Sequence, residues 1–415
     1  MDWLKGLVEQ HSELESPKSF WFWSGLCTIS AVVKDNVWLS RGEAYDLYPN
    51  IYVILHAESG LKKGPPIALA KTLVRKVNNT RIISGRSSIQ GIMKKLSTAY
   101  TIPGGKVINK SVGFICSSEL SSSIVEDSAA LTILTDLYDR HYNKDEWDSL
   151  LKSEEFQLKD PTVCLLGGIN EAHAEEFFGK KDIQGGFLAR TFVIYEKEEQ
   201  TINSLMRRLT NPPKPDELAK YLTELSKLQG RFVDTFNPDN SMTPVGKHYD
   251  DWYNAFRKQV KDSGVKDLTG TLNRFGDSVL KVAMLLALAR QPTLEITIRD
   301  LDLAFVVCEK LIGNIRQTTM GRRGMSSSAA LKAKVIRELM GRDNNMVSRT
   351  MLMKKMWMHY SDSAEFDDLM LSFHNTGMIV TEAAGNQIIY RMPSDQVEEM
   401  RKFLSGKIRK DLMEG

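Results

Sequence analysis

The chain has 415 residues, of which 42% are hydrophobic and 26% charged, and it carries a net charge of only +3. This composition is that of an ordinary soluble globular protein, and the length predicts one large domain with smaller appendages. No stretch reaches about 18 uninterrupted apolar residues, which excludes a membrane-spanning helix and argues against a membrane as partner.

The four cysteines lie far apart in the sequence, mostly inside apolar runs. This spacing predicts buried, reduced thiols in a cytosol-like compartment, with neither a disulfide framework nor a zinc site. The seven histidines show no metal-ligand spacing, so no resident metal site is expected. The opening segment "MDWLKGLVEQHSELE" is typical of an acidic amphipathic helix rather than a secretory signal, which predicts a cytoplasmic protein.

The first 45 residues are predicted to be mainly helical. Ser16 and Pro17 resemble a cap followed by a first-turn proline, and the apolar run "SFWFWSGLCTISAVV" indicates a buried helix. The segment "NVWLS" is a short strand candidate. The next segment, "NIYVILHA", ends at Ala57 and is apolar on both faces, as a central strand of a parallel sheet would be.

A polar turn, "ESGLKKG", follows this strand and precedes an amphipathic helix. This is the layout of a phosphate-binding loop, in which backbone N–H groups and a lysine hold phosphates. Aligned with the pattern G-x-x-x-x-G-K-[ST], the segment has Ala57 and Lys62 at the glycine positions and Gly64 at the hydroxyl position. Only Lys63 and the inner Gly60 of such a loop remain.

Two interpretations of this turn stay open. It could be a solvent-facing connection whose helix, about Gly64 to Val77, simply begins with the proline pair Pro65-Pro66. As a nucleotide site, it would hold phosphates through its backbone N–H groups and through the residues Ser59, Gly60, Lys62, Lys63 and Gly64.

Three later segments alternate with predicted helices. The segment "VGFICSSEL" is a buried strand with Glu119 at its carboxyl end, and "PTVCLLGGIN" is a buried strand that ends on Asn170. The segment "GFLARTFVIYEKE" is a fourth strand, which carries Arg190. Apolar strands that alternate with helices predict a parallel α/β sheet covered on both faces.

These three polar residues suit the chemistry of phosphoryl transfer. Glu119 could be a general base or a ligand to a magnesium-bound water, although Ser118 stands where an aspartate would hold the metal. Asn170 is placed to sense a γ-phosphate, and Arg190 suits an arginine finger that acts across a subunit boundary. The alternatives are a strand-end glutamate facing solvent, a turn asparagine and a surface arginine.

The character of the sequence changes from Pro212, where long amphipathic or buried helices begin. After a linker at 320–328, three short helices and two strands follow in the order of a winged helix. The expected organisation is an N-terminal helical segment, a P-loop ATPase core, a helical subdomain, a winged-helix-like domain and a C-terminal helix, which span 1–45, 46–210, 211–320, 329–393 and 394–415.

A locally basic block lies between Arg316 and Lys355 and hints at an anionic polymer as partner, or else forms a solvated helix face. The third helix of the predicted winged helix begins with Glu365, Asp367 and Asp368, which disfavours base readout. We therefore expect sequence-independent contact with the DNA backbone, or docking onto a protein. The candidate DNA-binding residues are Arg322, Arg323, Arg349, Lys354 and Lys355.

Taken jointly, these motifs resemble the RecA-like P-loop ATPases of bacteriophages and mobile elements, a family of helicase and primase-helicase type proteins. The resemblance covers about Ser16 to Arg316. It rests on "LYPNIYVILHAESGLKKGPP", "VGFICSSELSSSI", "LTDLYDRHY", "LLGGINEAHAEEFF", "GGFLARTFVIYE" and "LNRFGDSVLKVAMLLALA".

The resemblance implies an ATP-dependent DNA helicase or motor of phage replication or recombination, working in the bacterial host cytoplasm with ATP and Mg²⁺. It implies a hexameric ring of identical subunits that binds single-stranded DNA and other replication proteins. It assigns the loop lysine to Lys63, the strand-end glutamate to Glu119 and the finger arginine to Arg190. It also makes Arg274 a lid residue near the nucleotide.

The chain departs from the family where a hydroxyl residue usually follows the loop lysine, because Gly64 and Pro65 stand there. This departure puts magnesium binding and hydrolysis in doubt, although backbone amides and Lys63 could still hold phosphates. The alternative function is therefore a DNA-binding scaffold, clamp or helicase loader that binds nucleotide without hydrolysing it. A third reading is a winged-helix regulator with a structural α/β domain.

Overall fold

The computed structural model describes residues 2–42, 44–85, 88–102, 105, 107–120, 128–139, 146–151, 154–170, 186–199, 201–202, 212–233, 241–262, 270–315, 335–336, 338–340, 345–356, 363–385 and 387–398. The chain divides into two compact units, which are Met1–Thr319 (unit 1) and Met320–Gly415 (unit 2). The boundary coincides with the start of the segment expected as a linker.

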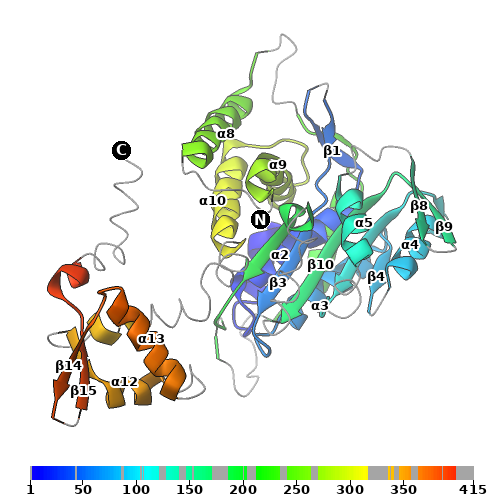
Figure 1. The fold of residues 1–415 in the computed structure, drawn as a ribbon. Coiled ribbons are helices and arrows are strands. Elements are labelled where there is room, and N and C mark those ends of the chain that lie inside the picture. Colours follow the sequence, from blue (N-terminus) through cyan, green and yellow to red (C-terminus); the bar gives the residue numbers. More distant parts are fainter. Residues whose placement is uncertain are drawn as a thin grey trace. The chain divides into compact units, whose positions relative to one another are not determined.

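Unit 1 is built around a five-stranded sheet in which all strands run parallel (Figure 1). The strand order is β11-β3-β10-β7-β4, so the first strand in the sequence lies between the fourth and the fifth. The parallel α/β class predicted from the sequence is confirmed. The strands are β3 (Tyr52–Ala57), β4 (Ile82–Ser84), β7 (Val112–Ser117), β10 (Thr162–Asn170) and β11 (Thr191–Tyr195).

Both faces of the sheet are buried, because successive side chains of each strand point to opposite faces. In β3, Val53 and Leu55 enter a hydrophobic core that contains α2 and α3. Tyr52 and Ile54 enter a second core, on the other face, that contains α4 and α5. The helices are α2 (Lys18–Val33), α3 (Gly64–Val77), α4 (Ile89–Ser97) and α5 (Ser128–Tyr138).

The sheet has a reversal point between β3 and β10, because the connections from these neighbouring strands lead in opposite directions, to β4 and to β11. The chain leaves β3 through α3 over one face, and returns from the far edge of the sheet through α4 and α5 over the other face. In open α/β sheets, ligands bind outside the carboxyl ends of the strands at such a reversal point. The topology therefore favours a ligand site at the carboxyl ends of β3 and β10.

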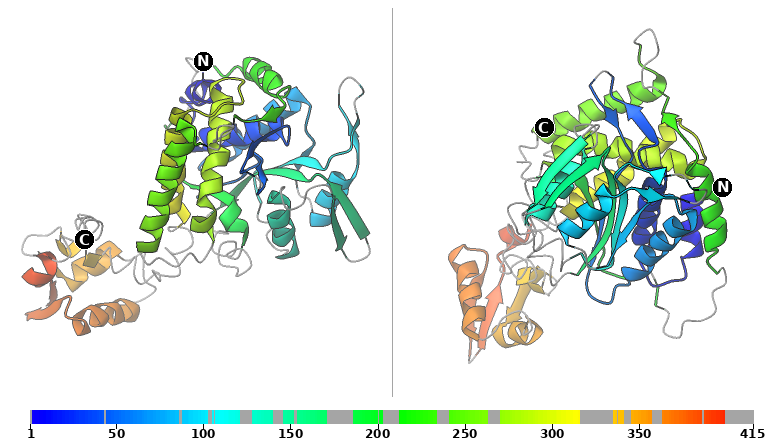
Figure 2. Two further views of the ribbon diagram at one scale, coloured as in Figure 1. Left: turned by 90° about the horizontal axis from the view of Figure 1, so that it is seen from above. Right: turned by 90° about the vertical axis from the view of Figure 1, so that its right-hand side faces the viewer.

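Further helices extend the core that contains α2 and α3. The helix α9 is buried along most of its length, and α10 packs against both α9 and the edge strand β11. Figure 2 shows these helices, green to yellow, at the side of the sheet away from α4. The helices are α1 (Trp3–Gln10), α7 (Pro215–Leu225), α8 (Pro244–Asp262), α9 (Thr271–Arg290) and α10 (Ile298–Ile315).

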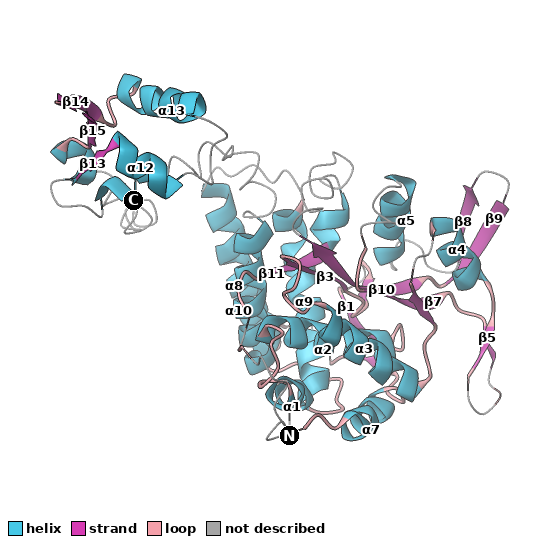
Figure 3. Ribbon diagram, turned by 90° about the horizontal axis from the view of Figure 1, so that it is seen from below, coloured by secondary structure: helices cyan, strands magenta, loops and turns pink. Residues whose placement is uncertain are grey.

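Short strands form the periphery of unit 1. A small mixed sheet joins β1 to its neighbours, and two antiparallel hairpins lie towards the β4 edge of the main sheet, where β9 packs on α4 (Figure 3). The strands of the small sheet are β1 (Val37–Ser40), β2 (Asp46–Leu47) and β12 (Gly230–Arg231). The hairpins are formed by β5 (Tyr100–Thr101) with β6 (Val107–Ile108) and by β8 (Glu146–Leu151) with β9 (Glu154–Lys159).

Three details differ from the sequence-based expectation. The helix α2 begins at Lys18 with Pro17 as its cap, and the Ser16 hydroxyl donates instead to the carbonyl of Lys62. The strand β11 begins only at Thr191, because a short 3₁₀ turn that ends at Arg190 precedes it. The N-terminal segment, the core and the helical subdomain share unit 1 and one continuous hydrophobic core.

Unit 2 has its own small core, which includes Phe366, Phe373 and Tyr390. A three-stranded antiparallel sheet with the order β13-β15-β14 packs with two helices. The strand β13 was not expected from the sequence. The elements are β13 (Met346–Ser348), α12 (Arg349–Met356), α13 (Ser363–Asn375), β14 (Val380–Ala384) and β15 (Gln387–Arg391).

The predicted burial of the four cysteines is confirmed. Burial raises the pKa of Cys116 to about 12 and that of Cys164 to about 11, so both thiols stay protonated near neutral pH. Over the described ranges, no helix combines the length and the apolarity needed to cross a membrane.

Candidate functional site

The turn after β3 folds around the side chain of Lys63. Although lysine is normally exposed, Lys63 is only 8% exposed, and its ammonium donates 2.8 Å hydrogen bonds to the carbonyl oxygens of Ala57 and Glu58. The turn therefore curls back over the end of its own strand, with the lysine charge at its centre. This arrangement places a cation and several backbone amides at the carboxyl end of the sheet.

The backbone of the turn is left-handed at two positions, although only one of them is a glycine. Gly60 has φ +98°, and Lys62 adopts the left-handed φ of +46° at the position where a phosphate-binding loop carries its second glycine. The left-handed region costs a residue with a Cβ about 1 kcal/mol of conformational free energy, so neighbouring contacts must hold Lys62 there. Ser16 donates to the Lys62 carbonyl at 2.8 Å, and Glu15 lies 3.6 Å from the Lys62 ammonium.

The helix α3 starts directly after this turn, with Lys63 as its cap and no acidic residue in its first turn. A helix amino terminus attracts anions through its unpaired N–H groups and its dipole. Pro65 and Pro66 carry no N–H, so they remove two of the donors that such a terminus normally offers. A phosphate at this terminus would therefore depend more on the turn and on Lys63 than in an ordinary phosphate-binding loop.

Glu119 is exposed and lies beyond the end of β7, on a segment that folds over β10. The Leu120 amide donates to the Gly168 carbonyl at 3.0 Å, and the Ser117 hydroxyl donates to the carbonyl of Glu119 at 2.9 Å. Since β10 lies between β7 and β3, this fold carries Glu119 from β7 towards the turn that contains Lys63.

The close crossing depends on the glycine pair in "CLLGGIN". A Cβ on Gly168 would lie 2.3 Å from the Ser118 carbonyl oxygen, and a Cβ on Gly167 would lie 1.8 Å from a methyl carbon of Leu120. A glycine pair inside a strand marks such a close approach of another backbone. The sequence shows the glycine pair but not the backbone contact that requires it.

Replacing Gly168 with alanine is expected to lower the free energy of unfolding by about 1–3 kcal/mol, because the backbone at Ser118 must move. Urea denaturation measures the change. The matched control is Gly91→Ala in α4, where the added Cβ meets the Ser88 hydroxyl at an ordinary 3.5 Å, and where alanine favours the helix. Equal stability of the Gly168→Ala variant and the wild type would show that the crossing is not tight.

Asn170 is the last residue of β10 and pairs in register with Ala57 at the end of β3. Its half-buried side chain therefore lies one strand away from the turn. Lys63, Glu119 and Asn170, which are far apart in the sequence, come from adjacent or nearly adjacent strands at one end of the sheet. This convergence follows from the strand order.

Arg190 lies at the opposite end of the same sheet. The residue after it, Thr191, pairs with Tyr52 at the start of β3. The Arg190 side chain is only 10% exposed; its Nε donates to Asp139 at 2.9 Å, its Nη2 contacts the same carboxylate, and its Nη1 donates to the Gly186 carbonyl. Arg190 is thus held by contacts within its own chain, at the end of the sheet opposite to Lys63.

Arg274, expected as a lid residue, joins this second cluster. Its guanidinium Nη1 lies 3.3 Å from Asp139, so the two arginines share one carboxylate at the amino ends of the strands. The geometry does not bring Arg274 to the turn around Lys63 of its own chain. Asp139, which joins the two arginines, was not singled out from the sequence.

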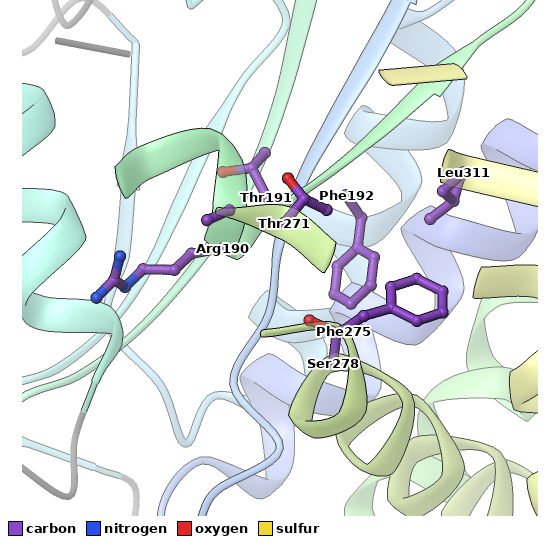
Figure 4. A pocket seen from close by; sticks show the side chains of 8 residues that line it. Arg190, Thr191, Phe192, Thr271, Phe275, Ser278 and Leu311 are labelled. Atoms are coloured by element: carbon purple, nitrogen blue, oxygen red, sulfur yellow. The ribbon is translucent and has the colours of Figure 1, made fainter. Parts of the chain in front are cut away.

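A small cavity lies beside Arg190. Its volume is about 20 Å³, which is room for about one water molecule. Figure 4 shows Phe192 and Phe275 against this space, with the Arg190 guanidinium pointing away from both rings. The cavity is too small for a nucleotide.

Lys281 of α9 is buried at the same amino end. Its ammonium donates to the Asn50 carbonyl at 3.0 Å and to the Asn50 side-chain oxygen at 2.8 Å, and it lies 3.7 Å from the centre of the Tyr138 ring. Burial lowers the pKa of Lys281 to about 7, although the carboxylates of Asp139 and Asp277 partly oppose the shift.

This pKa predicts a pH-dependent stability. In the unfolded chain, Lys281 keeps its proton up to its ordinary pKa of 10.5, whereas in the folded chain it loses the proton near pH 7. Between these values the unfolded state binds more protons, so the free energy of unfolding rises with pH, by at most about 1.4 kcal/mol per unit. Below pH 7 both states carry the proton, so this contribution stops changing with pH.

Denaturation at a series of pH values from 7 to 9.5 measures this slope. The variant Lys281→Met is expected to flatten it, whereas Lys220→Met, which replaces an exposed lysine on α7, should leave it unchanged. An identical slope in the wild type and in Lys281→Met would mean that this lysine stays protonated in the folded protein.

In unit 2, Arg349 is engaged by a carboxylate. Its Nε and Nη2 donate to the two oxygens of Asp367 at 2.8 and 2.7 Å, which is a paired fork geometry, and this ion pair lowers the pKa of Asp367. Arg349 is therefore less available to a DNA phosphate than its sequence position suggested. Lys354 and Lys355 lie on the same helix, but their side chains, like all of Arg322 and Arg323, fall outside the described residues.

No protein-family model and no curated protein matches this chain. The geometry of the two ends of the sheet is therefore the main basis for assigning a function.

Proposed function

We propose that unit 1 is a RecA-like P-loop domain that binds ATP at the turn between β3 and α3. The observation that carries this proposal is the buried Lys63 ammonium, which lies between two carbonyls of a left-handed turn at the reversal point of the sheet. In that position the lysine can exchange the Ala57 and Glu58 carbonyls for phosphate oxygens. Lysines of solvent-facing connections are normally exposed, so a buried lysine at this position supports a binding role.

We further propose that the domain hydrolyses ATP. Glu119 accepts a proton from the attacking water, and Asn170 contacts the terminal phosphate, because both follow strands that end beside the turn. Phosphoryl transfer needs positioning and charge stabilisation more than covalent chemistry. Lys63, Glu119 and Asn170 on a rigid sheet can therefore form a minimal catalytic site.

The residues at this end fit a magnesium ion that arrives with the nucleotide. Mg²⁺ uses one or two carboxylates and takes its other ligands from phosphates and water, and Glu119 is a suitable carboxylate. Within the described part of the chain, no group of three or more histidine, cysteine or acidic side chains could hold a metal by itself. When bound, Mg²⁺ neutralises charge on the phosphate oxygens.

A ring that moves along single-stranded DNA is the cellular role that we propose for this activity. Arg190 supports the ring, because an arginine that acts on a neighbour's nucleotide must lie away from its own phosphates. In this scheme, Arg190 leaves Asp139 when a neighbouring subunit presents its nucleotide. The order of helices and strands in unit 2 supports a winged-helix-like fold that contacts the DNA backbone or a replication protein.

The mass distribution of the purified protein tests the ring. With a non-hydrolysable ATP analogue and single-stranded DNA, we expect a shift to a larger species, a hexamer in the simplest case. We also expect single-stranded DNA to stimulate ATP turnover, and this effect should weaken with added salt. A protein that remains a monomer under all these conditions would contradict the ring.

A second candidate function is a nucleotide-binding scaffold, clamp or loader that does not hydrolyse ATP. Two departures from the usual motifs favour this function, which are Gly64 in place of a hydroxyl residue and Ser118 in place of an aspartate. The ion pair between Arg190 and Asp139 also favours it, because it keeps Arg190 from a neighbour's nucleotide. A turnover assay with magnesium separates the two functions, since the scaffold binds ATP and releases it intact.

A further inference from the structure

A cavity of about 470 Å³ lies between α2, α10 and the end of β11, within the size range of small-molecule sites. Its wall includes the rings of Phe22, Trp23 and Tyr195, and its polar groups include Ser19, Glu196 and Lys310. An aromatic wall with a few polar groups is typical of a site for a flat, polar ring. Neither the proposed phosphate contacts nor the proposed catalytic residues use this cavity.

The cavity adjoins the turn around Lys63 through two separate connections. The Glu196 amide donates to the His56 carbonyl at 3.1 Å, and His56 directly precedes Ala57, whose carbonyl accepts from Lys63. On the other side, Ser16 donates to the Lys62 carbonyl, and Ser19 donates to a Glu196 carboxylate oxygen at 2.6 Å. The wall of the cavity is thus connected to both ends of the turn that would hold the phosphates.

The orientation of a nucleotide follows from the strand order. Glu119 and Asn170 come from β7 and β10, on one side of β3, whereas the cavity lies at β11, on the other side. A terminal phosphate that faces the two catalytic residues leaves the other end of the nucleotide directed towards β11. Figure 3 shows α10 beside β11 on that side of the sheet.

We propose that this cavity binds the base of the nucleotide, and that it selects a purine with an exocyclic amino group. The proposal rests on the proposed nucleotide site. The Glu196 carboxylate is acceptor-only when ionised, so it pairs with amino hydrogens and repels a carbonyl oxygen. Phe22, which is half-buried on α2, supplies a ring for stacking. Adenine and guanine share the required amino group, and hypoxanthine lacks it.

The test is a titration of the full chain with ATP, GTP, ITP and inorganic tripolyphosphate, under conditions that prevent hydrolysis. At least one of ATP and GTP is expected to bind about tenfold or more tightly than ITP, because a hydrogen bond to a charged group is lost with ITP. Whichever binds more tightly identifies the base. Tripolyphosphate reports the phosphate contacts alone and should require Lys63.

Two variants test whether residues of the cavity cause this preference for ATP or GTP over ITP. Glu196→Gln keeps the shape and is expected to bring ATP and GTP to within about threefold of ITP, while Phe22→Ala weakens nucleotide binding about tenfold. Neither should change the affinity for tripolyphosphate, which also shows that the variants are folded.

Equal binding of ATP, GTP and ITP by the wild type would overturn the amino-group selection. Tripolyphosphate that binds as tightly as every nucleotide would overturn the base site while leaving the phosphate site intact. If neither tripolyphosphate nor any nucleotide binds, the proposed function and the base site fail together.

Discussion

Replacing Lys63 with alanine is expected to weaken ATP binding by about 10- to 100-fold, which is the effect of losing hydrogen bonds from a charged donor. Lys63 is buried and connects the Ala57 and Glu58 carbonyls, so its removal takes away the cation and also loosens the turn. Pro65 and Pro66 have already removed two helix donors, so other groups cannot easily compensate. Calorimetric titration with a non-hydrolysable ATP analogue and Mg²⁺ measures the loss.

Lys62 provides a matched control for this variant. It is the adjacent lysine, but its ammonium is exposed and lies near Glu15 at 3.6 Å, whereas the Lys63 ammonium is buried in the turn. Alanine keeps the Lys62 carbonyl that accepts from Ser16, so Lys62→Ala should retain the turn and most of the affinity. Full affinity in Lys63→Ala would mean that the buried ammonium does not hold phosphate. An equal loss of affinity in both variants would mean that positive charge in general, rather than the position of Lys63, is responsible.

Replacing Glu119 with glutamine is expected to lower the rate of ATP hydrolysis by at least about 100-fold, which is a typical contribution of a general base. Binding of ATP should be nearly unchanged, because glutamine keeps the shape and the fold of residues 118–120 over β10 depends on backbone contacts. The measurement combines the rate of phosphate release with a binding titration on the same preparation.

Glu198→Gln is the control for Glu119→Gln. Glu198 is an exposed carboxylate that follows β11 at the same end of the sheet, and its replacement should leave hydrolysis unchanged. Hydrolysis at the wild-type rate in Glu119→Gln would exclude Glu119 as the base. A wild type that binds ATP without turning it over would instead select the scaffold function.

Buried strands and the turn that follows β3 could be predicted from the sequence because their signals are local. The helix α3 spans Gly64–Val77 as predicted, and β3 and β10 are continuous apolar runs with clear polar ends. The three-residue strand β4 was missed, because so short a run has no distinct periodicity. Its position is fixed by pairing with β7, which is a non-local contact.

The candidate site was predictable only in part for the same reason. The order of motifs along the chain suggested that Lys63, Glu119, Asn170 and Arg190 act together, but it does not show which end of a strand a residue occupies. The register of β11 with β3 places Arg190 at the amino end, and the ion pair with Asp139 brings together residues 51 positions apart. Likewise, the pairing of Arg349 with Asp367 is invisible in a count of basic residues.

A crystal structure with a non-hydrolysable ATP analogue tests the central claim most directly. We expect triphosphate oxygens within hydrogen-bond distance of the amides of residues 59–64, with the Lys63 ammonium moved from the Ala57 and Glu58 carbonyls onto the phosphates. An analogue that is present at saturating concentration and bound elsewhere, while Lys63 still holds both carbonyls, would contradict ATP binding at this turn.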